Sequence, residues 1–213
     1  MQLSAPQKNV LETELYFKNT SVQNIGGYMI FEKRIEYDIL NKAFNRLLEN
    51  ADALRIRIVG KNNEAIQEFK EYKYEPLENA GVIDDIDEKC NQWMTTPFNI
   101  YDKLYAFRYF EYTGKCGLSI ILHHLISDAW SIALVVSKMV EYYNEFLNNE
   151  SVESSIPSYS LFLDKEQEYF NSDKYKKDMD FWNDRFAEKP AFVSFARNTN
   201  SKNPIGKKKK VYN

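Results

Sequence analysis

The chain has 213 residues, of which 44% are hydrophobic and 15% aromatic, and this composition excludes intrinsic disorder. Its 28 basic and 31 acidic residues give a net charge of −3, which argues against nucleic-acid binding. Cys90 and Cys116 are too few for a disulfide framework, so reduced thiols are favoured over the one disulfide that they could form. With no signal peptide and no apolar run of about 18 residues, the sequence predicts a cytoplasmic protein without a membrane span.

The first half of the chain is predicted to alternate helices and strands. Ser4 is placed to cap a helix that runs to Tyr16, with Pro6 in its first turn. Apolar spacing and turn residues then predict a strand at 27–32, a helix at 37–50, a strand at 54–59, one or two strands within 64–76, and a helix at 84–95.

The second half is predicted to open with a hairpin. Two β-prone runs, 105–112 and 116–122, flank a connection that contains Gly114, and the second run is apolar on both faces, as in a buried strand. The apolar period then changes to that of a helix, which gives helices at 129–148, 158–170 and 173–187. The fold class is therefore α/β or α+β, with a mixed sheet packed against helices.

The only two histidines, His123 and His124, are adjacent and lie between the buried strand and the long helix. Neighbours on a strand point to opposite faces, so one should face a site and the other should pack. Asp128 could close the turn, cap the helix or meet a buried arginine. A zinc site is disfavoured because His123, His124 and Asp128 are too few ligands. A Ser-His-Asp hydrolase is disfavoured because the sequence contains no Gly-x-Ser-x-Gly elbow. Such a histidine pair ordinarily serves packing and hydrogen bonding. The catalytic alternative is that one neutral imidazole acts alone as a general base.

Residues 122–131 read Leu-His-His-Leu-Ile-Ser-Asp-Ala-Trp-Ser, and this run resembles the His-His-x-x-x-Asp signature of condensation domains of non-ribosomal peptide synthetases, within the chloramphenicol-acetyltransferase-like superfamily. Further resemblances follow in order at residues 3–7, 35–58, 98–104, 159–169 and 181–190. Three departures are Ala129 in place of the usual Gly, Lys103 in place of Pro, and Asn50-Ala51 in place of Arg-His.

The resemblance implies that residues 1–190 form the N-terminal lobe of a two-lobe domain, with residues 191–213 as a connector toward an absent C-terminal lobe. The basic run at 207–210 is expected to be a solvated part of that connector. The implied reaction is peptide-bond formation between aminoacyl or peptidyl thioesters on the 4'-phosphopantetheine arms of donor and acceptor carrier proteins. It implies no bound cofactor and a lobe that is inactive alone, while the charge, the ligand count and the apolar runs predict no nucleic acid, no metal and no membrane.

On this resemblance His124 would face the substrate tunnel as a base or an amine-positioning group, while His123 would pack. Asp128 would hold the loop through a salt bridge to an arginine, with Arg55 or an arginine of the absent lobe as partner. A helix starting at residues 129–131 would turn its N–H groups toward His124 and favour the neutral imidazole. Trp130 is expected to be a packing anchor, and Ser131 a residue of the first helical turn without a base beside it.

Three functions from different classes remain open on the sequence. The first is condensation-domain catalysis. The second is a related acyltransferase that uses a soluble, coenzyme-A-type acyl thioester, or an epimerisation domain that shares the motif. The third is a non-catalytic binding lobe, in which His124 would have no chemical role. A heterocyclisation domain is disfavoured, because that group carries Asp-rich residues in place of His-His.

Overall fold

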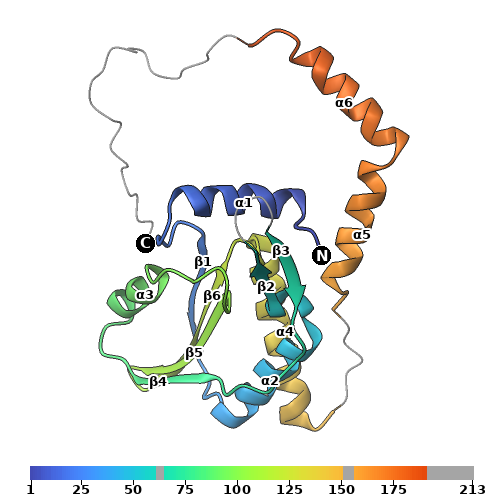
Figure 1. Ribbon diagram of the computed structural model, residues 1–213. Coiled ribbons are helices and arrows are strands. Elements are labelled where there is room, and N and C mark those ends of the chain that lie inside the picture. The colour runs from blue at the N-terminus through green and yellow to red at the C-terminus, as the bar shows by residue number, and fades with distance from the viewer. Residues whose placement is uncertain (61–64, 151–155, 191–213) are drawn as a thin grey trace, which may run out of the picture. The chain divides into compact units, whose positions relative to one another are not determined.

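The computed structural model describes residues 1–60, 65–150 and 156–190 (Figure 1). The chain divides into two compact units, Met1–Gln167 and Glu168–Asn213. The predicted connector at 191–213, with its basic run, lies outside the described residues. The motif around His123 and His124 belongs to the first unit.

A mixed sheet forms the centre of the first unit. Its strand order is β1 (Asn24–Ile30), β6 (Lys115–His123), β5 (Tyr105–Tyr112) and β4 (Glu78–Val82). Strands β1, β6 and β5 are antiparallel neighbours, whereas β4 runs parallel to β5. The hairpin turn between β5 and β6 has positive φ at Thr113 and Gly114, as a two-residue type I′ turn requires. Strand β6 is buried along its length after Lys115, so the predicted hairpin and buried strand are both confirmed.

Helices cover both faces of this sheet. Helices α2 (Tyr37–Asn50) and α4 (Ala129–Asn148) lie against one face, and α3 (Ile86–Met94) lies on the other (Figure 1). The larger core is on the α2 and α4 side, where the side chains of β6 meet both helices: Leu118, Ile120 and Leu122. The smaller core on the α3 side is built around Phe110, with Ile83 and Ile86. The ends of α2 and α4 agree with the ranges predicted from apolar spacing.

Helix α1 (Ala5–Tyr16) begins with a capping box, in which the Ser4 hydroxyl accepts from the Gln7 N–H and the Gln7 side chain accepts from the Ser4 N–H. A separate two-stranded sheet pairs β2 (Ile56–Val59) with β3 (Ile66–Phe69). Only one strand, β3, falls within the predicted range 64–76 among the described residues.

The predicted strand at 54–59 is wrong in its first two residues. Residues Asp52–Arg55 form a 3₁₀ turn, η1, because Leu54 donates its N–H to the Ala51 carbonyl and buries its side chain in the larger core. The Arg55 guanidinium reaches back to the last carbonyls of α2, those of Leu48 and Glu49. These contacts hold the backbone in a turn, so β2 starts only at Ile56.

Helix α5 (Tyr159–Phe170) runs to the end of the first unit and into the second, and α6 (Asp173–Arg185) lies in the second unit, where Ser172 caps it. Both helices agree with the predicted ranges to within two residues. No helix in the described parts of the chain combines the length and the apolar character that crossing a membrane would require. Both cysteines are free and buried.

Candidate active site

A cavity of about 510 Å³ lies in the first unit, beside the loop that follows β6. Its wall combines segments of α1, α2, η1, α4 and α5 with that loop. Most of the wall is apolar. The polar side chains that line it are those of Gln7, Asp52, His124, Ser127, Asp128, Ser131 and Tyr159.

His124 is the histidine that lines this cavity. Strand β6 ends at His123, and the half-buried His124 begins the turn, with its N–H bonded to the Gln23 carbonyl at 2.9 Å. Its ring Nδ1 lies 3.0 Å from the Ser127 carbonyl oxygen. A carbonyl can only accept a hydrogen bond, so Nδ1 carries the proton and the neutral ring keeps its lone pair on Nε2. His124 lines the cavity, and His123 does not.

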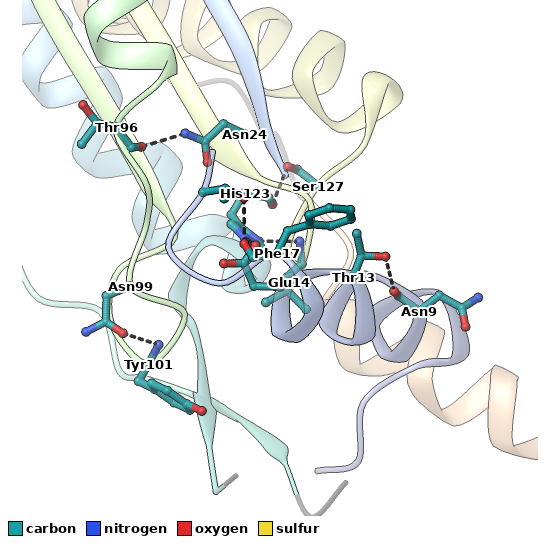
Figure 2. A network of polar contacts seen from close by, with 12 residues as sticks. Asn9, Thr13, Glu14, Phe17, Asn24, Thr96, Asn99, Tyr101, His123 and Ser127 are labelled. Atoms are coloured by element: carbon teal, nitrogen blue, oxygen red, sulfur yellow. Dashed lines mark hydrogen bonds and ion pairs between the residues drawn. The ribbon is translucent and has the colours of Figure 1, made fainter. Parts of the chain in front are cut away.

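His123 is buried, and its ring lies beside Glu14 of α1 (Figure 2). Its Nδ1 accepts the Leu125 N–H at 3.1 Å, so the neutral ring carries its proton on Nε2, which faces the Glu14 carboxylate at 3.4 Å. Burial, and secondly the repulsion that a protonated His124 would exert, lower the pKa of His123 to about 4. Burial also raises the pKa of Glu14. The two adjacent histidines are therefore in opposite tautomers.

Acid is expected to destabilise the fold through His123. Its folded pKa of about 4 lies below the ordinary value of 6.5, so the unfolded chain binds a proton first as pH falls through that window. The free energy of unfolding therefore falls as the pH is lowered from 6.5 to 4, by on the order of 3 kcal/mol in total. Above pH 6.5 this contribution of His123 to stability is fully present. Glu14 opposes this change. Its pKa is raised in the folded chain, so as the pH falls the Glu14 carboxylate binds its own proton in the folded chain before it does so in the unfolded chain. Denaturant titrations across this pH range measure the slope.

Two variants test whether His123 and Glu14 cause this dependence of stability on pH. His123→Asn keeps an acceptor for the Leu125 N–H but cannot titrate, so the dependence of stability on pH should flatten. Glu14→Gln removes the opposing proton uptake, so the dependence should steepen. A His123→Asn protein with the same slope as the wild type would contradict the assignment.

Asp128 is exposed and is the N-cap of α4, which is one of the three roles that the sequence left open for it. Its carboxylate Oδ1 accepts the Ser131 N–H at 2.8 Å and the Ser131 hydroxyl at 2.7 Å. The backbone bond and then the hydroxyl bond from Ser131 hold the pKa of Asp128 below its usual value. Within residues 1–60, 65–150 and 156–190 no salt bridge to Asp128 is formed, and Arg55 is bound instead to carbonyls of α2 and to that of Lys70.

Asp128→Ala is accordingly expected to lower the free energy of unfolding by about 0.5–2 kcal/mol, the cost of losing an N-cap. A buried ion pair broken on one side would cost about 3–5 kcal/mol. Asp128→Asn keeps the acceptor and loses only the charge at the helix start, so about 0.3–1 kcal/mol is expected. Denaturant unfolding of both variants tests this, and equal losses of the larger size would restore the ion-pair interpretation.

The remaining motif residues are in the first turn of α4. Ser131 donates its hydroxyl proton to the Asp128 carboxylate at 2.7 Å, so a base does lie beside this oxygen, contrary to the expectation. The Trp130 side chain is 84% exposed, and the expectation that it anchors the packing of this unit is wrong.

Two cavity residues have polar contacts that the sequence did not predict. Asp52 accepts the Tyr159 N–H at 2.9 Å and the Ser158 hydroxyl, and thus holds the start of α5. The Tyr159 hydroxyl lies 3.2 Å from the Ser4 Oγ. Asp52 and Tyr159 are 107 positions apart, so no local pattern could reveal the pair.

Comparison with curated proteins finds relatives among large synthases of Bacillus subtilis (strain 168). Surfactin synthase subunit 1 is 28% identical over 93% of this chain, and a subunit of plipastatin synthase is 27% identical over 92%. The matched region is 6% of the first protein and 8% of the second, so this chain spans a small part of either relative.

Solved structures share the fold. The starter condensation domain of rhizomide synthetase aligns with a TM-score of 0.75 at 18% identity, over 91% of this chain and 50% of that one. The first condensation domain of the calcium-dependent antibiotic synthetase, in complex with a substrate analogue, aligns with a TM-score of 0.76 at 16% identity, over 91% and 49%. This chain thus spans about half of each solved chain. The family model of the condensation domain matches residues 1–211, and the chain belongs to the condensation domain family.

Proposed function

We propose that this chain contributes the histidine-bearing half of a site that forms peptide bonds between carrier-bound thioesters, in the non-ribosomal synthesis of peptides such as antibiotics. Membership in the condensation domain family supports the reaction class. The observation that carries the proposal is the state of His124, whose Nδ1–H is held by the Ser127 carbonyl while its ring lines a largely apolar cavity. In the neutral ring that arrangement leaves Nε2 without a proton, as a general base or an amine-orienting acceptor requires.

The proposed step joins an acceptor amine to a donor thioester. The amine nitrogen attacks the thioester carbonyl, the new C–N bond forms, and the C–S bond breaks. The amine gives a proton to His124 Nε2, or is oriented by it, and the departing pantetheine thiolate receives a proton to become the free thiol. The products are one amide and one thiol, so neither an oxidant nor a metal enters the balance.

A second lobe of similar size is part of the proposal, since this chain spans 50% and 49% of the two solved chains. Exposed apolar side chains near His124 support a covering partner: Trp130 is 84% exposed, Leu134 46% and Phe162 45%. Donor and acceptor carrier proteins would present their substrates on 4'-phosphopantetheine arms, in the cytoplasm. Without a second wall the two thioesters are not held together, and positioning supplies about 7–11 kcal/mol of barrier reduction in such reactions. The chain by itself should therefore fold but not catalyse.

The test compares the chain alone with a protein that also contains a second lobe, each mixed with donor and acceptor carriers loaded with aminoacyl groups. A dipeptidyl product only with the longer protein, detected by mass spectrometry on the acceptor carrier, supports the proposal. Product from an acyl-coenzyme A donor alone would indicate a soluble-substrate acyltransferase. Inversion of the substrate without product would indicate epimerisation, and no reaction in any mixture would favour a binding lobe.

A further inference from the structure

A buried glutamine pair lies behind the loop that carries His124. Gln7 of α1 and Gln67 of β3 are 3% and 0% exposed, and their amides bond to each other in both directions, at 2.9 and 3.0 Å. Gln7 Oε1 also accepts the Ser4 N–H at 2.9 Å, and its Nε2 also donates to the Leu125 carbonyl at 2.9 Å. Both protons and both lone pairs of the Gln7 amide are thus in use, which only an amide of this length can achieve here.

The Leu125 carbonyl that Gln7 holds belongs to the loop that sets the His124 ring. On its other side this loop is fixed to His123, because the Leu125 N–H donates to the ring Nδ1 at 3.1 Å and the Ser127 hydroxyl donates to the His123 carbonyl at 3.0 Å. The loop ends at the Ser127 carbonyl, which accepts from His124 Nδ1. The position of that oxygen selects the tautomer with a free Nε2.

We infer that Gln7 is a positioning residue for His124: its side-chain amide fixes the loop of residues 125–127, and through it the tautomer in which His124 Nε2 is available to substrate. The inference rests on the proposed function for its consequence in catalysis, but the tautomer itself is a property of this chain alone. Gln7 also lines the cavity, so the same side chain joins the wall of the site to the loop behind it.

The tautomer is measurable because the chain has only two histidines. Long-range ¹H–¹⁵N correlation spectra of the ¹⁵N-labelled chain, at about 1.5 pH units above the ordinary imidazole pKa of about 6.5, report the proton position on each ring. The wild type should show Nδ1–H for His124 and Nε2–H for His123. In Gln7→Met the ratio of Nδ1–H to Nε2–H in His124 should fall by about 2- to 10-fold, the factor that one hydrogen bond corresponds to.

Gln67→Met is the matched control. It breaks the same glutamine pair but leaves Gln7 bonded to Leu125 and Ser4, so the His124 ratio should stay within about 2-fold of the wild type. The His123 signal reports whether the core is intact in each variant. Where Gln7→Met does not fold, Gln7→Glu keeps an acceptor for the Ser4 N–H, but its carboxylate cannot donate to the Leu125 carbonyl. An unchanged His124 ratio in a folded Gln7 variant, or an equal change in Gln67→Met, would overturn the inference.

The consequence for catalysis is tested separately, in an active protein that contains the second lobe. Gln7→Met should lower kcat with little change in KM, since the substrates still bind while fewer His124 rings present Nε2. A tautomer that shifts while kcat is unchanged would support Gln7 as the positioning residue and contradict the proposed role of His124. A tautomer that does not shift contradicts the inference and leaves that role intact.

Discussion

Replacing His124 by alanine is expected to lower the rate of amide formation by about 10²- to 10⁴-fold in an active protein that contains this chain, the range that a positioned general base contributes. The reason is that His124 supplies the free imidazole nitrogen of the cavity, whereas His123 is buried and bonded at both of its ring nitrogens. Single-turnover assays with loaded carriers measure the effect, alongside the melting temperature of each variant.

His123→Ala is the matched control, because it removes the same group from the adjacent position. Its effect should be mainly a loss of stability, since it leaves the Leu125 N–H and the Glu14 carboxylate without their partner. Equal chemical defects in the two variants, at unchanged melting temperatures, would contradict the assignment of His124.

His124→Asn tests whether the Nε2 nitrogen of His124 is itself required, or only the hydrogen bond from the side chain to Ser127. The asparagine amide can still donate to the Ser127 carbonyl, but it places no nitrogen where Nε2 was. If Nε2 takes up the proton or orients the amine, this variant should be as slow as His124→Ala. An asparagine variant within a few-fold of the wild type would show that only the bond to Ser127 matters.

Gly26→Ala is expected to destabilise the fold by about 3–5 kcal/mol, through backbone strain and overpacking together. Gly26 has a φ of 145°, and a Cβ there would lie 2.0 Å from the Ile120 carbonyl oxygen and 2.8 Å from the Ile121 Cα. These are backbone atoms of β6, the strand that β1 pairs with, so no side-chain rotation can relieve the clash. Strand β1 would have to separate from the strand that leads to His124.

Gly27→Ala provides the control at the next position. A Cβ there meets no atom within 4 Å, so the change should cost under about 1 kcal/mol and could add stability by restricting the unfolded chain. Denaturant unfolding of the two variants gives the comparison. Similar free energies of unfolding would show that β1 moves away from β6 at little cost.

Local signals were enough to place most helices and the hairpin. The apolar repeat defined α2 and α4 to the residue, and Ser4 with Pro6 marked the start of α1, because periodicity and capping depend on residues within one or two turns. Residues 54–55 were wrongly assigned to a strand because contacts outside their own segment decide their conformation. Alternation indicated a strand there, but the turn is held by carbonyls at the end of α2.

The sequence by itself determined the family signature, the mixed sheet, and the presence of two histidines at the end of a buried strand, where alternation sends their side chains to opposite faces. Only the tertiary structure decided which nitrogen of each ring is protonated, that Asp128 caps α4 rather than pairing with Arg55, and that Trp130 is exposed. The contacts that fix the site join Gln7 to Leu125 across 118 positions and Glu14 to His123 across 109. No local pattern encodes such pairs, because they form only when α1 packs against the end of β6.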